Sequence, residues 1–374
     1  MKKILIIVLS IFIISGCTSY KELSDIAIVT TMALTKENNN YKIIVQVLDT
    51  KKSTTDTINP SVVLYESKGI TIHEAFRNIS LESSKNLYTG HLTTVIVSDS
   101  IFKNDTDNFI DFIERNNEID KNFDLLITTN NIKDIMEIIP PLESIPSEKI
   151  SKSIEIASKF QGMIDIVKFD NFLENIYTTG IDPVLPIIYI KEVDSNNKDI
   201  NPDKRLLLKK ELAIFKDNKF INYLSVDASL GFNILNKSDT SSIITFNCKN
   251  SYASVTLNNV IPTINYNINT KKLDISLDID AIFNEINCNL DIKNDRNILI
   301  DMFNERIKNI VLSTIKEEKE NNSDFLGIEN NIYKNNYEFY KNNNIDNIIK
   351  NLDTNITINS NFNRNINYKG SEKY

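Results

Sequence analysis

The sequence predicts an α+β protein of more than one domain, with mixed and antiparallel sheets flanked by helices. In the first half, strand-like and helix-like stretches alternate, which favours a mixed sheet covered by helices. In the second half, apolar and polar residues alternate strictly over 273–281, and a helical stripe of apolar residues follows over 299–311. With 374 residues, 41% of them hydrophobic and 25% charged, the chain can bury large cores.

The first half opens with a predicted hairpin and a short strand. Residues 25–34 and 41–48 have strand patterns on either side of a polar turn, and 61–66 form a third strand before Gly69. Thr71 and Glu74 then form a capping box, which predicts a helix over 71–81. His73 falls in the first turn of this helix, where we expect a solvated side chain.

A continuous apolar run predicts a central strand at 95–97, preceded by the loop Leu87-Tyr88-Thr89-Gly90-His91-Leu92. Further elements follow the 3.6-residue or continuous apolar patterns. They are a helix at 105–114, a strand at 123–128, a helix that Ser147 caps, a helix at 168–177 and an extended connector at 180–186. Prolines near residue 140 mark a place where this domain could divide further.

The polar residues 191–205 form the predicted domain boundary. Beyond it we expect a hairpin around Asp217-Asn218, a helix at 225–235, and strands at 242–248, 252–257, 260–269 and 273–281. A long helix at 297–316, a turn at 324–327, a helix at 331–349 and a last strand at 354–368 complete the chain.

Three carboxylates lie in the predicted strand 273–281 and could be a functional site. Asp274, Asp278 and Asp280 could indicate metal binding or acid/base chemistry, but they stand at alternate positions without a glycine turn or a second cluster. Alternate residues of a strand point to one face. We therefore expect these carboxylates to form the solvated face of an antiparallel sheet.

The first seventeen residues have the parts of a lipoprotein signal. Lys2 and Lys3 form a positive region, eleven apolar residues follow over 4–14, and small residues precede Cys17. The apolar run is shorter than the about twenty residues of a membrane-spanning helix and fits a secretory signal. We expect cleavage before Cys17 and a diacylglyceryl group on its thiol. The alternatives are a plain signal peptide with an incidental cysteine and a buried N-terminal helix.

Two acyl chains anchor a protein stably to a bilayer, and no later segment offers eighteen consecutive apolar residues. The predicted protein therefore sits on a membrane without spanning it. Its predicted parts are a signal peptide at 1–16, a lipidated N-terminus and tether at 17–24, an N-terminal α+β domain at 25–195 and a C-terminal α+β domain at 205–374.

Composition excludes several classes of function. A net charge of -8 and a pI near 5.1 argue against a nucleic-acid partner, which requires a basic face. No nucleophile elbow, phosphate-binding loop, zinc motif or calcium loop is present, so we predict no enzyme, no cofactor and no metal site. Cys248 and Cys288 lie in strand-like stretches; a disulfide between them is possible, but we expect two buried free thiols.

Several segments together resemble the spore germination family of C-type germinant-receptor subunits, the Ger(x)C lipoproteins. The most specific is Leu81-Glu82-Ser83 through Leu87-Tyr88-Thr89-Gly90-His91-Leu92. The resemblance begins at Cys17 and continues through 69–75, 180–186, 211–215 and Asp324-Phe325-Leu326-Gly327, so it covers nearly the whole mature chain. The chain departs from many members at Thr18-Ser19, where they place an aromatic and an acidic residue.

The resemblance implies a noncatalytic lipoprotein subunit of a nutrient germinant receptor. It would lie on the outer face of the inner spore membrane, beside A-type and B-type integral membrane subunits. Tyr88, His91 and Asp182 lie in family-like segments and are candidate interface residues, with structural roles as turn or strand-end residues as the alternative. A germinant-binding lipoprotein is the second hypothesis and predicts a pocket between the two halves. A surface hydrolase is the third, and no motif supports it.

Overall fold

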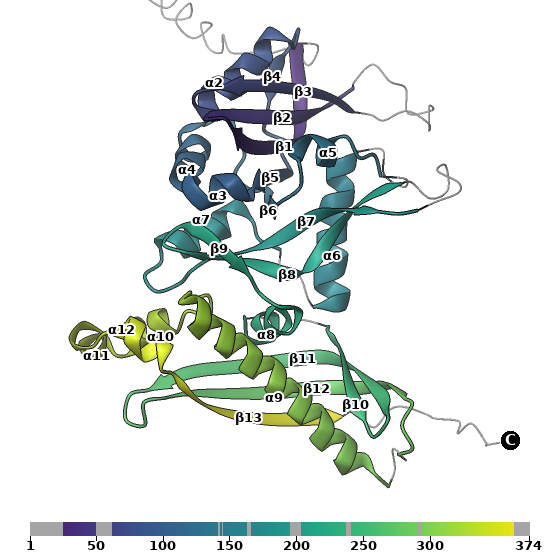
Figure 1. The fold of residues 1–374 in the computed structure, drawn as a ribbon, viewed down its shortest axis with the longest axis vertical. Helices are drawn as coiled ribbons and strands as arrows, with labels where there is room; N and C mark the ends of the chain where they lie inside the picture. Colours follow the sequence, from purple (N-terminus) through teal and green to yellow (C-terminus); the bar gives the residue numbers. More distant parts are fainter. Residues whose placement is uncertain are drawn as a thin grey trace, which may run out of the picture.

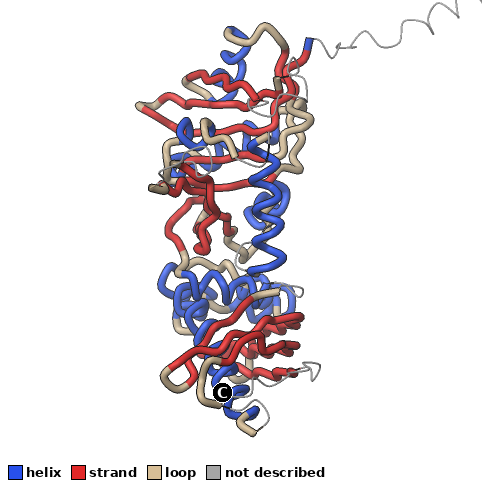
Figure 2. Tube along the Cα trace, turned by 90° about the vertical axis from the view of Figure 1, so that its right-hand side faces the viewer, coloured by secondary structure: helices blue, strands red, loops and turns tan. Residues whose placement is uncertain are grey.

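The computed structural model describes residues 25–49, 62–140, 143, 145–162, 166–194, 203–236, 241–290 and 294–362. The signal peptide, Cys17, the tether and residues 363–368 of the expected last strand therefore lie outside the described residues. The molecule is elongated, with two sheets stacked along its long axis (Figures 1 and 2). We call residues 25–223 the first module and residues 241–362 the second module.

The first module is built on a nine-stranded mixed sheet in the order β3-β2-β1-β5-β6-β7-β8-β9, with β4 paired to the start of β1. Pairing is parallel from β1 through β5 and β6 to β7 and antiparallel elsewhere on this path. The strands are β1 (Ile26–Glu37), β2 (Asn40–Leu48), β3 (Val62–Gly69), β4 (Asn86–Tyr88), β5 (Thr94–Ser98), β6 (Asp124–Thr128), β7 (Val184–Glu192), β8 (Lys204–Lys216) and β9 (Lys219–Tyr223).

Helices cover both faces of this sheet, which explains the continuous apolar runs of its central strands. Every residue of β5 and β6 is buried. One face packs on the phenylalanine-rich helices α2 (Ile72–Asn78), α3 (Asp99–Asn104), α4 (Thr106–Arg115) and α7 (Phe169–Tyr177). The other face packs on α5 (Ile132–Met136) and α6 (Pro146–Gln161).

The predicted start of α2 is confirmed, whereas the predicted cap of α6 is wrong and two short helices were not predicted. Thr71 caps α2 by accepting from the Glu74 amide, and Glu74 accepts from the Ile70 amide. The chain continues into the 3-10 helix η2 (Ile79–Leu81), so the predicted helix at 71–81 is present. Helix α6 starts at Pro146 rather than at a Ser147 cap, because proline suits a first helical turn whose amides have no partner. The short helices α3 and α5 were not predicted, since each is only about one turn of pattern.

The predicted boundary at 191–205 falls inside a hairpin of the first sheet. Strands β7 and β8 flank it and pair antiparallel from Glu192–Lys204 back to Val184–Ile214. The predicted connector at 180–186 likewise enters β7, with Pro186 inside the strand. The change from one sheet to the other therefore comes later, after β9.

Helix α8 (Val226–Asn236) lies between the two modules (Figure 1). It is buried on almost its whole circumference, because β8 lies on one side and α9 on the other. Gly231 allows this approach: a Cβ atom there would stand 2.0 Å from Thr314 Oγ1. Ser229 Oγ also accepts from the Leu212 amide of β8. The helix is thus tied to both modules.

The second module is a four-stranded sheet in the order β10-β11-β12-β13, crossed on one face by a long helix (Figure 1). The expected strands at 252–257 and 260–269 form one strand with an irregularity between Leu257 and Asn259. The elements are β10 (Ile243–Cys248), β11 (Ser251–Asn267), β12 (Lys272–Ile286), α9 (Arg296–Asn321), α10 (Ile328–Asn335), α11 (Tyr337–Asn342), α12 (Ile345–Lys350) and β13 (Asp353–Phe362). The single helix expected at 331–349 is thus three short helices.

The strict alternation in β12 has the expected consequence. Its apolar residues are buried under α9, and its carboxylates face away from the helix. Each carboxylate accepts from an asparagine of β13: Asp274 from Asn355, Asp278 from Asn359 and Asp280 from Asn361. These carboxylates form a solvated, hydrogen-bonded face, as predicted. The sheet is mixed rather than antiparallel throughout, because β13 pairs parallel with β12.

The expectation of two free thiols is wrong. Cys248 at the end of β10 and Cys288 just after β12 form a disulfide, with Cα atoms 5.8 Å apart. The two cysteines are in reach because β10 and β12 both pair antiparallel with β11, which brings their C-terminal ends together beside the start of β11. The sequence pattern predicted both strands but not that each pairs with β11.

Candidate functional site

Tyr88 and His91 lie together on the surface of the first module. Their rings meet edge to face with centroids 5.7 Å apart, and both side chains are exposed. A Cβ atom at Gly90 would stand 2.5 Å from the Tyr88 hydroxyl, so a larger residue there would displace the exposed Tyr88 ring. Thr89 is buried and donates to the Glu118 carbonyl, which fixes the loop. This part of the family-like segment has a structural core and two exposed rings.

Asp182 lies elsewhere, at the junction between the modules. Its amide donates to the Asp324 carbonyl at 2.9 Å, and its carboxylate accepts from the Asp324 amide at 2.7 Å. Lys216 Nζ, from the end of β8, donates to the same carboxylate oxygen at 3.3 Å. Among the described residues, no contact joins Asp182 to Tyr88 or His91. The three sequence candidates therefore belong to two separate places.

The connection before β7 is also fixed to the second module by asparagine. The Asn330 side chain donates to the Thr179 carbonyl at 2.7 Å, and its amide donates to the Gly180 carbonyl at 3.2 Å. Gly180 has φ +73°, and a Cβ atom there would stand 2.6 Å from the Asn330 amide. Only glycine fits this close, left-handed position. Two family-like segments, 180–186 and 324–327, thus meet at one junction.

Asp324 also determines where α10 begins. Its two carboxylate oxygens accept from the amides of Ile328 and Glu329, at 2.7 and 2.6 Å. These amides have no partner inside the helix, so a carboxylate there completes the first turn. Phe325 packs with Phe232 of α8 in a small apolar cluster between the modules. One short segment therefore caps a helix, binds Asp182 and fills the junction core.

Glu318 of α9 adds a second buried carboxyl to this junction. Burial, and next the negative charge of Asp324, raise the pKa of Glu318 well above its ordinary value. Burial likewise raises the pKa of Asp324 to about 7, although the Glu329 and Ile328 amides act against it. Both carboxyl oxygens of Glu318 are buried without a hydrogen-bond partner among the described residues. Burial therefore favours the protonated form of Glu318.

Asp182 and Lys216 form the charged side of the same cluster. Burial raises the pKa of Asp182, and the positive charge of Lys216 opposes that shift. Burial lowers the pKa of Lys216, but Asp182 outweighs it and the net direction is upward. Asp182 and Lys216 thus form an ion pair, while burial favours the protonated form of Glu318. We call Asp182, Lys216, Glu318 and Asp324 the junction cluster.

The junction cluster can join two modules and respond to protons; it shows no further chemistry. Among the described residues, no group of three or more His, Cys, Asp or Glu side chains is arranged to hold a metal ion. The main cavities lined by described residues each lie within one module. None of them is the pocket between the halves that a germinant-binding lipoprotein predicts.

Sequence reasoning found Asp182 but missed Lys216 and Glu318. Glu318 had a readable signal, because it continues the buried stripe of α9 that runs through Ile307, Val311 and Ile315. A charged residue at a buried helical position is uncommon and indicates a special environment. Lys216 had no such signal, since its partner comes from another part of the chain.

Comparisons with known proteins cover both modules. The family model described as the spore germination protein N-terminal domain matches residues 19–190. The model described as spore germination B3/GerAC like, C-terminal, matches residues 210–365. The chain belongs to the GerAC-like family of spore germination proteins. The resemblance first seen in the sequence motifs is thereby confirmed.

Individual relatives agree with this membership. Spore germination protein KC of Bacillus subtilis (strain 168) is 21% identical over 352 residues, which are 88% of this chain and 86% of that protein. Putative spore germination protein YfkR of the same organism is 24% identical over 217 residues, 55% of each chain. The crystal structure of the GerBC protein has a TM-score of 0.57 at 14% identity and covers 88% of this chain and 96% of that chain. The GerAC-like chain therefore shares its fold with GerBC.

No helix among the described residues of this GerAC-like protein has the length and apolar content that crossing a membrane requires.

Proposed function

We propose that this chain is the lipid-anchored, noncatalytic C subunit of a nutrient germinant receptor. It acts on the outer face of the inner spore membrane, beside A-type and B-type integral membrane subunits. The observation that carries the proposal is the match of two GerAC family models to both modules, over 19–190 and 210–365. The N-terminal pattern that ends at Cys17 supports the anchor.

Anchoring explains how a modest protein interface could suffice. A domain tethered to the bilayer meets its membrane partners at a high effective concentration. The junction cluster supports a noncatalytic role, because Asp182, Lys216 and Asp324 bind one another and the backbone of the second module. It would keep the modules in one orientation while the chain contacts its partners.

The first experiment replaces Cys17 by alanine in the chain expressed in spores. We expect the protein to be lost from the inner-membrane fraction and nutrient-triggered release of dipicolinic acid to fall. Ser19→Ala, two residues away, is the matched control and should leave both unchanged. If the C17A protein stays in the membrane fraction and the spores respond normally, the lipid anchor is wrong.

The second experiment tests the partners. Membranes from dormant spores are solubilised, and the tagged full-length chain is isolated with whatever it binds. We expect A-type and B-type receptor subunits to be recovered in stoichiometric amounts. Recovery of the chain alone, from membranes that contain both subunits, would contradict the receptor assignment.

A further inference from the structure

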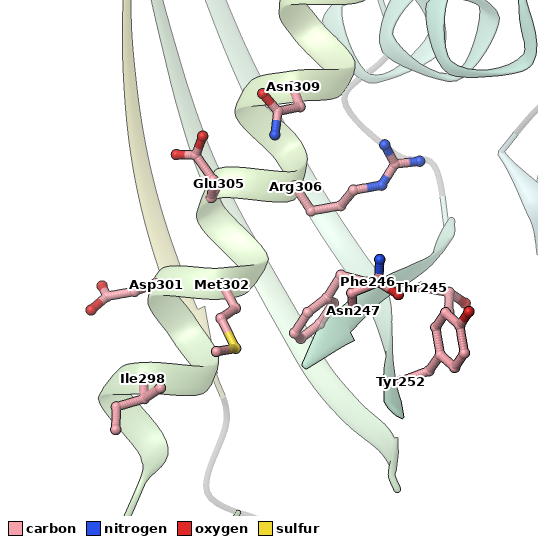
Figure 3. A pocket seen from close by; sticks show the side chains of 10 residues that line it. All are labelled: Thr245, Phe246, Asn247, Tyr252, Ile298, Asp301, Met302, Glu305, Arg306 and Asn309. Atoms are coloured by element: carbon pink, nitrogen blue, oxygen red, sulfur yellow. The ribbon is translucent and has the colours of Figure 1, made fainter. Parts of the chain in front are cut away.

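The outer side of β10 borders a groove of the second module. The groove has a volume of about 830 Å³ and lies between β10 and the exposed side of α9 (Figure 3). Thr245, Phe246 and Asn247 line it from the strand. Successive residues of a strand point to opposite faces of its sheet. A groove lined by three successive residues must therefore run along the edge of the strand, where the backbone N–H and C=O groups point.

This edge has backbone groups available for pairing. In the described part of the chain, β10 is the end strand of its sheet and pairs only with β11. Every second residue of such a strand directs its N–H and C=O to the open side. Proteins usually protect open edges with lysine, proline or inward charges. From Ile243 to Cys248, β10 contains no charged residue and no proline.

The edge is also held in place. Cys248, the last residue of β10, is bonded to Cys288, and Phe246 packs against Phe303 of α9. A pre-ordered edge lowers the entropy cost of adding a strand. Beside this edge, two apolar side chains that line the groove offer contact area: Ile298 is 44% exposed and Tyr252 is 60% exposed. The groove thus has a rigid backbone edge flanked by apolar side chains.

The charges on the helix side of the groove select its partner. Arg306 is already bound by Asp227, with two contacts of 2.6 and 2.7 Å. Asp301 and Glu305 are exposed and form no ion pair with any residue that the structure describes. Once Arg306 is neutralised, the groove carries an acidic excess. An occupant with lysine or arginine side chains would complement it.

We propose that this groove binds an extended, basic segment of a partner protein, which adds a strand to β10. Backbone hydrogen bonds to the open edge supply the pairing. Apolar side chains of the segment rest against Ile298 and Tyr252, and its basic side chains face Asp301 and Glu305. This surface goes beyond the receptor assignment, and its test needs neither spores nor membrane subunits.

The probe is an eight-residue peptide of alternating lysine and valine, capped at both ends, added to the full-length chain in detergent. A second peptide has the same side chains but N-methyl groups on alternate amides, which block strand addition. A third replaces lysine by glutamate. We expect saturable binding of the first peptide only, and slower amide hydrogen exchange in β10 when it is bound.

Two variants locate the binding. Asp301→Asn with Glu305→Gln should weaken binding of the lysine–valine peptide about tenfold, in keeping with two exposed charge pairs. Glu320→Gln, an exposed acid near the other end of α9, is the matched control and should bind like the wild type. Both changes are on the helix surface, so the fold should be retained.

Three results would overturn the proposal. One is the absence of saturable binding at about 1 mM peptide, the limit of weak affinity. Another is equal binding of the N-methylated or glutamate peptide. The third is a dimer of the chain that protects β10 from exchange without peptide, because the occupant would then be a second copy.

Discussion

The two modules differ in how their sheets meet water. In the first module, β5 and β6 are covered on both faces, and every residue of both strands is buried. In the second module, β12 is covered by α9 on one face only, so buried and accessible residues alternate. Neighbouring residues of one strand therefore contribute equally to stability where both faces of the sheet are covered, and unequally where only one face is covered. This difference also explains why one module contains continuous apolar runs and the other contains alternating ones.

The largest expected effect tests this difference with pairs of neighbours. Ile96→Ala and Val97→Ala in β5 should both destabilise the protein, with Ile96→Ala costing about 2–5 kcal/mol, because both side chains are fully buried. In β12, Leu277→Ala should cost a similar amount, whereas Asp278→Ala should stay within about 0.5 kcal/mol. Urea unfolding of the four variants measures this. Equal losses for Leu277→Ala and Asp278→Ala would show that the polar face is also covered.

The second effect concerns the disulfide, the one such bond among the described residues and confined to the second module. Its cysteines are 40 residues apart in sequence, and closing such a loop stabilises by about 2–4 kcal/mol. The double variant Cys248→Ala with Cys288→Ala should lose that amount in the unfolding transition of the second module. A reducing agent should lower the free energy of unfolding of the wild type by a similar amount and leave that of the double variant unchanged. If the reductant also lowers the stability of the double variant, the effect of the reductant does not come from this disulfide.

The third effect tests the contact between the modules through its pH dependence. The pKa of Asp324 is about 7 when folded and near 4 when unfolded, so the folded state binds more protons in between. The free energy of unfolding of the protein must then fall as the pH rises from about 4 to 7. The raised pKa of Glu318 acts in the same direction. We expect a loss on the order of 2 kcal/mol between pH 5 and 8, since one unit of pKa shift is about 1.4 kcal/mol.

Glu318→Gln removes one of these protons and keeps the size of the side chain. We expect this variant to be more stable than the wild type at pH 8 and to vary less with pH. Glu320→Gln, on the exposed side of the same helix, is the control and should keep the wild-type profile. A Glu318→Gln profile that overlays the wild type would show that the junction cluster does not titrate in this range.

The smallest effects compare ion pairs of the two modules. Asp105 accepts from Lys36 at 2.9 Å, from Tyr41 and from Asn108, and its side chain is only 10% exposed. Asp105→Asn should cost about 1.5–3 kcal/mol, the range for hydrogen bonds to a charged group. Lys272 and Asp353 form an exposed pair at 2.8 Å in the second module. Lys272→Ala should change stability by less than about 1 kcal/mol.

The pH dependence of these ion pairs sharpens the comparison. Burial raises the pKa of Asp105, but its hydrogen bonds to Lys36 and Tyr41 outweigh this and lower it overall. The stabilisation from Asp105 is therefore present above pH 4 and is lost as the pH falls through its lowered pKa. Asp105→Asn should narrow the difference in stability between pH 6 and pH 3. An unchanged difference would assign the acid sensitivity to other carboxylates.

Local patterns predicted most single elements and failed where partners are distant in sequence. The turn at Asp217-Asn218 is such a success: both residues have positive φ, which asparagine and aspartate tolerate best after glycine. The expected helix at 331–349 failed because its asparagines compete for backbone groups and end short helices; Asn344, for example, caps α12. The domain boundary at 191–205 stays a prediction; the structure adds that β7 and β8, on either side of it, pair in one sheet.

The candidate site shows the same division. The motif at 180–186 identified Asp182, and the turn at 324–327 was expected, yet nothing in the sequence placed them side by side. Glu318 could have been noticed as a charge in a buried stripe, but not its neighbour. Tyr88 and His91 were predicted together and do lie together, since only a glycine and a threonine separate them.

By itself, the sequence determined the fold class, most strands and helices, the solvated face of β12 and the family. These depend on periodicity and local chemistry, which act over a few residues. Only the tertiary structure decided the disulfide, the junction cluster, the sheet that β8 and β9 join, and the open edge of β10. Each of these depends on which segments become neighbours, and that follows from burying all apolar faces at once rather than from any one stretch of chain.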